Sequence, residues 1–368
     1  MISVNDTMSP KTGGEYVYRV MKEELLRQGR TVYEISVPFL LRKLEPERGR
    51  VRVEETYRLL LHARCVLESF WKRLQNRFLV ITSSSPVFPV FGHLVYHQPK
   101  TSTCTEKGKE YLSIHQKIGM ILHENEKLSP AWLVAKRSHV LHLSNSLFTK
   151  KLIKGLYGLD SLVLYPPVDI SSLLKTDLLA KREPAVLVTK PRAISGISIL
   201  PEIVMKLPRT RFVVIGEADS VGSRIIDCLK KRGANIHYMG YVDTIAKQRL
   251  FSKCTHYLQL GLNESFGITV IEAMAAGCVP IAPESGAIPE YLHENLFYKD
   301  TDDAVGKIEA EVGAEDADLR SRLRQASLKF EEKNFRDGFM THVARIESAR
   351  SNDKQCAKAY WSDCRVGN

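Results

Sequence analysis

The sequence predicts two doubly wound α/β domains that face each other across a cleft. The chain has 368 residues, which is enough for about two domains of ordinary size. Short apolar runs, which favour buried parallel strands, alternate with segments that carry apolar residues at helical spacing. This alternation stops at a linker and then restarts. We therefore expect an N-terminal domain at 1–168, a linker at 169–184, a C-terminal domain at 185–350 and a tail at 351–368.

The N-terminal domain opens with a strand–loop–helix–strand pattern, which is typical of a parallel α/β sheet. An apolar run at 2–4 predicts the first strand, and a turn-rich loop that ends in Gly13 and Gly14 follows it. Apolar residues at helical spacing then predict a helix at 15–27. Further strands are predicted at 31–37, 78–81, 93–96, 140–143 and 162–164, and further helices at 54–74, at 111–122 and after the N-cap cluster 144–146.

The C-terminal domain repeats this alternation. Strands are predicted at 185–189, 211–215, 235–238, 256–259, 279–282 and 296–298, and helices at 197–205, 221–231, 246–252 and through 302–348. Ligands of such sheets bind beyond the carboxyl ends of the strands, so the cleft between the domains is the expected site. The tail at 351–368 shows no clear period, and we expect it either to pack back on the N-terminal domain or to be disordered.

The chain is basic, and most of the excess lies in its first half. It holds 53 Lys and Arg against 42 Asp and Glu, a net charge of +11. Residues 1–170 contain 25 of the basic and 16 of the acidic side chains. Such a half attracts anions, for example an anionic membrane surface or phosphorylated substrates, although a basic bias without a partner is an equal alternative. No nucleic-acid partner is expected, because the chain lacks helix-turn-helix, RNA-recognition and zinc-finger signatures.

The length of the apolar runs and the spacing of the cysteines predict the cellular compartment of the protein. No run approaches the roughly 18 residues that cross a membrane, and the first residues lack the basic and apolar regions of a signal peptide. The seven cysteines include no C-x-x-C pair, which is typical of reduced thiols and argues against a zinc site. We therefore expect a cytoplasmic protein that binds no metal.

The segment 263–277 carries the most informative chemistry. It begins as a loop and becomes a helix, and Gly267 allows a ligand to approach the backbone closely. The free N–H groups of Ile268–Val270 would favour an anion such as a diphosphate. Glu272 lies about one turn into the helix, near a ribose beside that diphosphate, and Glu264 on the loop could hold sugar hydroxyls. The same spacing also fits an ordinary helix whose N-terminal dipole favours acidic residues.

The stretch from Glu264 to Pro280 resembles the signature of the family-4 retaining glycosyltransferases, the glycosyltransferase group 1 type, in which two glutamates are separated by seven residues. The run 285–290 is similar to the next loop of that family, and the runs 144–146 and 165–169 resemble other family segments. The resemblance implies a GT-B fold of two Rossmann-like domains. It also implies retention of anomeric configuration, no metal and no cofactor apart from a nucleotide-sugar donor.

The resemblance also assigns roles to particular residues. Glu272 would hold the ribose, Glu264 would orient the donor hexose, and the backbone of the loop would hold sugar and diphosphate. The donor-binding residues expected on this basis are Gly13, Gly14, Ser265, Phe266, Gly267, Ile268, Thr269 and Glu272.

In similar enzymes an Arg, and a Lys directly before a Gly, neutralise the leaving diphosphate. This sequence has Lys190 near the Arg position and Ser195 before Gly196, where the family has its Lys. Arg192 is the candidate to replace the missing charge, so Lys190 and Arg192 are the expected cations. The alternative is that both are surface charges of a loop. A guanidinium and an ammonium are not interchangeable at a phosphate site, so the departure from the family pattern at these positions bears directly on activity.

His97 is the fourth expected catalytic residue, with Glu264, Lys190 and Arg192. The run 96–103 resembles the His-x-Pro segment of the dolichol-linked-oligosaccharide mannosyltransferases, in which a His contacts the transferred sugar. His93 is a weaker candidate, and we interpret His139 and His142 as structural residues.

Together these features predict a retaining hexosyltransferase that uses a nucleotide diphosphate sugar. GDP-mannose is the first expectation for the donor, followed by UDP-glucose or UDP-N-acetylglucosamine. The expected acceptor is a glycan or a lipid-linked acceptor, and one expected location is the cytoplasmic face of a membrane. Two other classes remain open: a nucleotide-sugar epimerase or phosphorylase of similar fold, and a non-catalytic nucleotide-sugar-binding partner protein.

Overall fold

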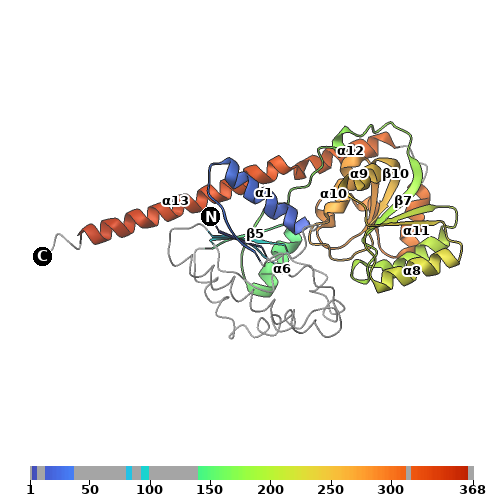
Figure 1. Ribbon diagram of the computed structural model, residues 1–368, viewed down its shortest axis with the longest axis horizontal. Coiled ribbons are helices and arrows are strands. Elements are labelled where there is room, and N and C mark those ends of the chain that lie inside the picture. Colours follow the sequence, from blue (N-terminus) through green and yellow to red (C-terminus); the bar gives the residue numbers. More distant parts are fainter. Residues whose placement is uncertain are drawn as a thin grey trace.

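The computed structural model describes residues 2–5, 13–36, 80–84, 93–98, 140–311 and 316–363 of the chain. These residues form two α/β lobes, each built around a parallel sheet (Figure 1). The predicted helices at 54–74 and 111–122 lie outside the described residues, as does His139.

The N-terminal lobe contains a six-stranded sheet in the order β2-β1-β3-β4-β5-β6. Every pair of neighbouring strands in it is parallel. The chain order reverses between β1 and β3, which is the switch point where doubly wound sheets bind ligands. Its elements are β1 (Ile2–Asn5), α1 (Gly13–Arg27), β2 (Tyr33–Ser36), β3 (Val80–Ser84), β4 (Leu94–His97), β5 (Leu141–Ser144), α6 (Leu147–Tyr157) and β6 (Leu162–Val163).

The C-terminal lobe has a second parallel sheet, in the order β12-β11-β10-β7-β8-β9. Its switch point lies between β7 and β10. Its strands are β7 (Glu183–Thr189), β8 (Arg211–Ile215), β9 (Ile236–Gly240), β10 (Cys254–Leu258), β11 (Val279–Pro283) and β12 (Phe297–Tyr298). The helices of this part of the chain are α7 (Leu200–Lys206), α8 (Ser220–Lys231), α9 (Thr244–Lys253), α10 (Ile268–Ala276), α11 (Thr301–Glu311), α12 (Ala317–Ser327) and α13 (Glu332–Asp363).

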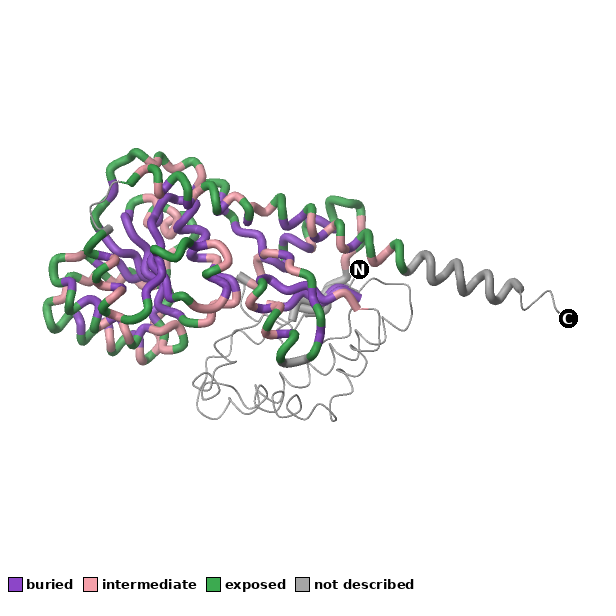
Figure 2. Tube along the Cα trace, turned by 180° about the vertical axis from the view of Figure 1, so that it is seen from behind, coloured by how far each residue is buried: buried purple, intermediate pink, exposed green. Residues whose placement is uncertain are grey.

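Alternate residues of β7 belong to two different apolar clusters, so this sheet is buried on both faces. Val186 and Val188 belong to one apolar cluster, whereas Ala185 and Leu187 belong to a second cluster. Helices cover both faces of such a sheet, so its strands read as continuous apolar runs. Figure 2 shows the buried residues gathered at the centre of this lobe. These strands were predicted from the sequence, and the structure confirms them with ends that differ by a few residues.

Gly196 lets two loops approach each other at the switch point. Its φ is +80°, and a Cβ atom there would lie 2.5 Å from the carbonyl oxygen of Leu260. The loop after β7 therefore packs directly on the loop after β10, and any side chain at this position would separate them.

Helix α13 returns the chain to the N-terminal lobe, where it lies beside α1 (Figure 1). Phe335 and Phe339 are buried in the same apolar cluster as Leu25, and Arg336 forms ion pairs with Glu23 (2.8 Å) and Glu24 (3.3 Å). The chain therefore re-enters the N-terminal lobe before residue 350, the position at which the sequence predicts the end of the C-terminal domain.

The two crossings between the lobes lie side by side. Val168 forms a parallel bridge with Glu331.

Residues 351–363, for which the sequence predicts no period, continue α13 as a helix. Within the described residues, no helix has the length and apolar character needed to cross a bilayer.

Candidate functional site

The signature loop, which we define as residues 263–267, leads from β10 into α10 at the switch-point edge of the C-terminal sheet. Gly267 caps α10 with φ +86°. A Cβ atom there would lie 2.7 Å from the Tyr291 hydroxyl oxygen, so this position favours glycine both by conformation and by space. The sequence predicts a loop that becomes a helix here, and the structure confirms this change at Gly267.

Fewer N–H groups are free at the N-terminus of α10 than we expect from the sequence. The Val270 N–H donates to the Gly267 carbonyl oxygen at 2.9 Å, so the expectation that Val270 faces a ligand is wrong. Within the described part of the chain, no acceptor takes the N–H groups of Ile268 and Thr269. Two free donors and the positive end of the helix dipole still favour an anion here.

Glu272 is buried within α10, where it is 7% exposed. Its Oε1 accepts a hydrogen bond from Lys247 Nζ on α9 at 2.6 Å. Its Oε2 is also buried but has no partner among the described residues. Buried carboxylate oxygens are almost always hydrogen-bonded in native proteins, so Oε2 is suited to accept a hydrogen bond from a hydroxyl group that binds beside the helix.

Glu264 and Lys190 come together at the switch point. Lys190 directly follows β7 and has φ +53°, and its Nζ lies 3.8 Å from Glu264 Oε1. The same carboxylate oxygen accepts a hydrogen bond from Gln259 Nε2 at 3.3 Å. The structure thus places one predicted cation beside one predicted carboxylate, on the loop that leads into α10.

Arg192 has a different neighbour. Its Nε donates to the Glu217 carbonyl oxygen at 3.0 Å, and its guanidinium lies 3.1 Å from the Glu217 carboxylate. It therefore does not share the contact of Lys190 with Glu264. Its predicted role in holding the leaving group stays a prediction.

His97 ends β4 with its side chain buried against His142 of β5. The His97 Nε2 and His142 Nδ1 atoms are 3.0 Å apart, and the two rings stack. Burial lowers the pKa of His97 to about 3, helped by the neighbouring imidazole, and lowers the pKa of His142 to about 4. Both rings are therefore neutral near pH 7.

The contact between these two histidines is absent from the sequence analysis. Val95 is opposite His142 in the β4–β5 register, two residues before His97. Alternation along a strand places residues two apart on one face of the sheet, which is the signal that could have found the pair.

Residues at the carboxyl end of β5 connect the His97 strand to the signature loop. The Asn145 N–H donates to the His97 carbonyl oxygen at 3.1 Å, and Asn145 Nδ2 donates to Ser265 Oγ at 3.4 Å. Ser146 Oγ donates to the Ser265 carbonyl oxygen at 2.7 Å. The predicted residues of the two lobes therefore meet at one interface, with Asn145 between them.

The remaining predicted residues have structural contacts. Gly13 and Gly14 begin α1, and the Gly14 carbonyl oxygen accepts a hydrogen bond from Gln98 Nε2 at 3.3 Å. The Phe266 ring is buried, 5.2 Å from the Phe330 ring and 5.6 Å from the Tyr291 ring between centroids. Its side chain anchors the loop, so its backbone is the part available to a ligand.

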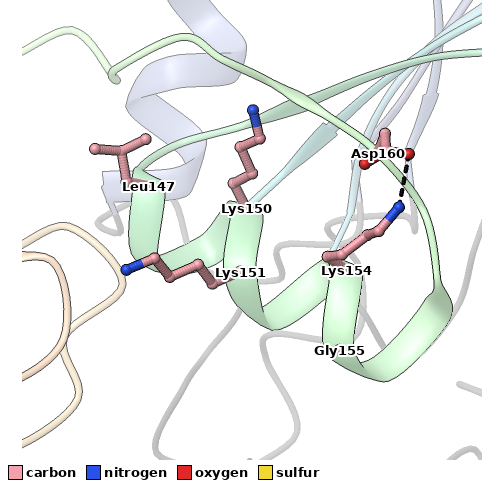
Figure 3. Close-up of a pocket in the computed structure, with 6 residues that line it drawn as sticks. All are labelled: Leu147, Lys150, Lys151, Lys154, Gly155 and Asp160. Atoms are coloured by element: carbon pink, nitrogen blue, oxygen red, sulfur yellow. Dashed lines mark hydrogen bonds and ion pairs between the residues drawn. The ribbon is translucent and has the colours of Figure 1, made fainter.

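A separate cavity of about 460 Å³ lies along α6. Its lining residues are Leu147, Lys150, Lys151, Lys154, Gly155 and Asp160 (Figure 3). Lys154 Nζ donates to Asp160 at 2.7 Å, whereas Lys150 and Lys151 point their ammonium groups away from this pair. The cavity is therefore cationic. The described residues contain no group of three or more His, Cys, Asp or Glu arranged to hold a metal ion.

Comparisons with known sequences identify similar proteins. Residues 192–328 match the model of the family described as glycosyl transferases group 1. One similar protein is the GDP-Man:Man(3)GlcNAc(2)-PP-Dol alpha-1,2-mannosyltransferase of Dictyostelium discoideum, 23% identical over 56% of this chain and 46% of that protein. Another is the phosphatidyl-myo-inositol mannosyltransferase of Mycolicibacterium smegmatis, 28% identical over 34% of this chain and 33% of that protein. The aligned part of the chain thus spans about half the first relative's length and a third of the second's.

Solved structures show the fold. The chain superposes on a sucrose-phosphate synthase of Thermosynechococcus elongatus with a TM-score of 0.69 at 11% identity, over 95% of this chain and 99% of that one. It superposes on the lipopolysaccharide glycosyltransferase WaaG with a TM-score of 0.62 at 12% identity, over 92% and 98%. These matches confirm the expected arrangement of two Rossmann-like domains. Residues 192–328 are thus similar to the glycosyl transferases of group 1, and the chain has the GT-B fold.

Proposed function

We propose that this protein is a retaining glycosyltransferase that moves a hexose from a nucleotide diphosphate sugar to an acceptor hydroxyl. The observation that carries the proposal is the position of two carboxylates around one anion-binding helix end. Along the chain, Glu264 precedes and Glu272 follows the free N–H groups at the start of α10, and Lys190 contacts Glu264. This arrangement suits a ligand with a sugar, a diphosphate and a ribose in that order.

Each group has a specific role in this proposal. The N–H groups of Ile268 and Thr269 and the ammonium of Lys190 bind the diphosphate, where negative charge develops as the bond to the anomeric carbon breaks. The Oε2 atom of Glu272 accepts a ribose hydroxyl, and Glu264 accepts a hydroxyl of the donor hexose. The positive charge comes from the protein, so the proposed reaction requires no metal ion.

GDP-mannose is the first donor that we propose, with UDP-glucose and UDP-N-acetylglucosamine as alternatives. The run around His97 supports a mannosyl donor by resemblance, and the two relatives described above are both named as mannosyltransferases. The contact of His97 with His142, and its link through Asn145 to the signature loop, are compatible with a wall of the hexose pocket.

We also propose that the acceptor is a lipid-linked glycan at the cytoplasmic face of an anionic membrane. The cationic cavity of α6 supports this, because three lysines line it beside Leu147, which is 46% exposed. Clustered lysines gain about 1 kcal/mol each near an anionic lipid surface. Sedimentation with anionic liposomes should show binding that high salt weakens, and binding that is independent of salt would exclude this part of the proposal.

The first test of the donor site is calorimetric titration with GDP, UDP, ADP and their sugars in the presence of a chelator. Wild type is compared with Glu272→Ala and with Glu309→Ala, a control at an exposed residue of α11. We expect one nucleotide to bind to wild type and to the control but not to Glu272→Ala. Equal binding by all three proteins would reject the assignment of Glu272. The anomeric configuration of the product, measured by NMR, tests retention.

A second function is favoured by one observation: Ser195 stands where similar enzymes have a Lys, and Arg192 is paired with Glu217. A chain with a reduced cation set could bind the nucleotide sugar without transferring it. Binding of a donor together with no transfer or hydrolysis across a panel of lipid-linked and free glycan acceptors would favour this non-catalytic role.

A further inference from the structure

Glu290 connects the two lobes at the start of α6. Its Oε1 accepts a hydrogen bond from the Phe148 N–H at 2.7 Å, and its Oε2 accepts one from the Leu147 N–H at 2.9 Å. The Tyr165 hydroxyl also donates to Oε2, at 3.0 Å. Leu147 and Phe148 belong to the N-terminal lobe, whereas Glu290 follows β11 in the C-terminal lobe. Tyr165 follows β6 and packs against the core of the C-terminal lobe. One carboxylate thus caps a helix of the opposite lobe.

This cap suits the electrostatics of the helix end. The first N–H groups of a helix have no partner within the helix, and its dipole places partial positive charge there. Two adjacent N–H groups and two carboxylate oxygens form paired charge-assisted hydrogen bonds, which are stronger than neutral ones. A glutamine could supply only one acceptor oxygen, and its NH₂ group would face the second N–H.

The capped helix in turn holds the signature loop. Ser146, the N-cap residue of α6, accepts the Thr149 N–H through Oγ at 3.0 Å and donates from the same atom to the Ser265 carbonyl oxygen at 2.7 Å. On the other side, the Tyr291 hydroxyl donates to the Phe266 carbonyl oxygen. Two successive carbonyl groups of the loop are therefore fixed, one from α6 and one from the neighbour of Glu290.

We propose that Glu290 is a positioning residue that holds the signature loop in its ligand-binding form by capping α6 across the interface between the lobes. Through Ser146, the cap fixes the Ser265 carbonyl group, which precedes the free N–H groups of Ile268 and Thr269 in the loop. Glu290 itself contacts neither of these N–H groups. The inference rests on the proposed function, because the loop that it orders is the proposed diphosphate site.

Hydrogen–deuterium exchange of the full-length protein tests the cap without any ligand. Glu290→Gln removes one acceptor and the charge, and Tyr165→Phe removes the third donor. Glu294→Gln, at an exposed residue four positions further on, is the matched control. We expect faster exchange at 146–149 and 265–270 in Glu290→Gln, a smaller increase in Tyr165→Phe, and no change in the control. Unchanged exchange at these two segments would overturn the proposal, as would faster exchange spread over both lobes.

Steady-state kinetics separates positioning from a general loss of stability. We expect Glu290→Gln to raise the KM for the sugar donor about tenfold, the effect of losing ~1.4 kcal/mol of binding free energy. We expect the kcat to change by much less than tenfold and the melting temperature to stay close to that of wild type. An unchanged KM in a variant with faster local exchange would also overturn the proposal. If wild type neither binds nor transfers any donor, the proposed function fails, and the exchange experiment still decides whether Glu290 orders the loop.

Discussion

Lys247 Nζ lies 2.6 Å from Glu272 Oε1, and this pair joins α9 to the buried helix that carries the second signature carboxylate. The Lys247 side chain is 29% exposed and the Glu272 side chain 9%, so the pair is partly shielded from water. A shielded carboxylate with one oxygen paired and one oxygen free combines a fixed position with an available acceptor. This relationship explains how Glu272 can be both buried and suited to a ligand.

Lys247→Met should destabilise the protein, because it leaves both oxygens of the Glu272 carboxylate without a partner while the aliphatic stem stays packed. We expect the free energy of unfolding to fall by about 1–3 kcal/mol, the usual cost of a buried group left unsatisfied. Urea unfolding of this variant is compared with Lys253→Met, at an exposed position of the same helix. The same stability in both variants would contradict a structural role for the pair.

Lys190 and Arg192 should differ in their effect on transfer. Lys190→Ala removes the cation beside Glu264, and we expect it to lower kcat by about 10²- to 10³-fold, the range for loss of a donor that stabilises developing charge. Arg192→Ala should have a much smaller effect, because the Arg192 guanidinium is paired with Glu217. The measurement is single-turnover transfer at saturating donor. Equal losses in the two variants would show that Arg192 leaves Glu217 when the donor binds.

Acid should destabilise the protein through the His97–His142 pair. Burial lowers the pKa of these residues to about 3 and about 4, below the value of about 6.5 in an unfolded chain. Between these limits the unfolded chain binds more protons, so stability is fully present above pH 6.5 and is lost as the pH falls. Each of the two neutral imidazoles makes the free energy of unfolding fall by up to about 1.4 kcal/mol for each pH unit of acidification in this range.

Chemical denaturation between pH 7 and pH 4.5 measures this slope. His142→Gln should make it shallower, whereas His293→Gln, at an exposed position, should leave it as in wild type. A slope that is identical in wild type and His142→Gln would show that other groups, such as the buried His256, cause the acid sensitivity.

Two glycines should respond in opposite ways to alanine. Gly267 has φ +86°, and a Cβ atom there would lie 2.7 Å from the Tyr291 hydroxyl oxygen. Gly267→Ala should therefore destabilise the protein by about 1–3 kcal/mol and weaken nucleotide binding. Gly306 lies within α11, where a Cβ atom would contact nothing within 4 Å. Gly306→Ala should stabilise the helix by up to about 1 kcal/mol and leave binding unchanged. Thermal unfolding and nucleotide titration of both variants check this pair.

Local patterns in the sequence predict the architecture and part of the site. The strands around Val186 and Val213 are apolar runs bounded by turn residues, and such runs follow from neighbours along the chain. The loop-to-helix change at Gly267 is also local, because it depends on the conformational freedom of one residue. The spacing of Glu264 and Glu272 is visible in the sequence for the same reason.

The contacts that complete the site were decided by tertiary structure. Glu290 caps a helix that begins 143 residues earlier in the chain, and His97 contacts a residue 45 positions away. For His97 and His142, strand alternation indicates a shared face of the sheet but not which strands are neighbours. Residue spacing contains no signal for the contacts of Glu290, because their geometry depends on how the lobes pack. The same holds for Lys247 beside Glu272 and for the return of α13 to the N-terminal lobe. The sequence by itself determined the two-domain α/β architecture, since this follows from short-range periodicity, and the resemblance of its run 264–280 to a family signature singled out the two glutamates. Only the packing of the two lobes decided which partners hold these glutamates and the signature loop, because hydrogen bonds between distant residues form only when the whole fold brings their atoms within reach.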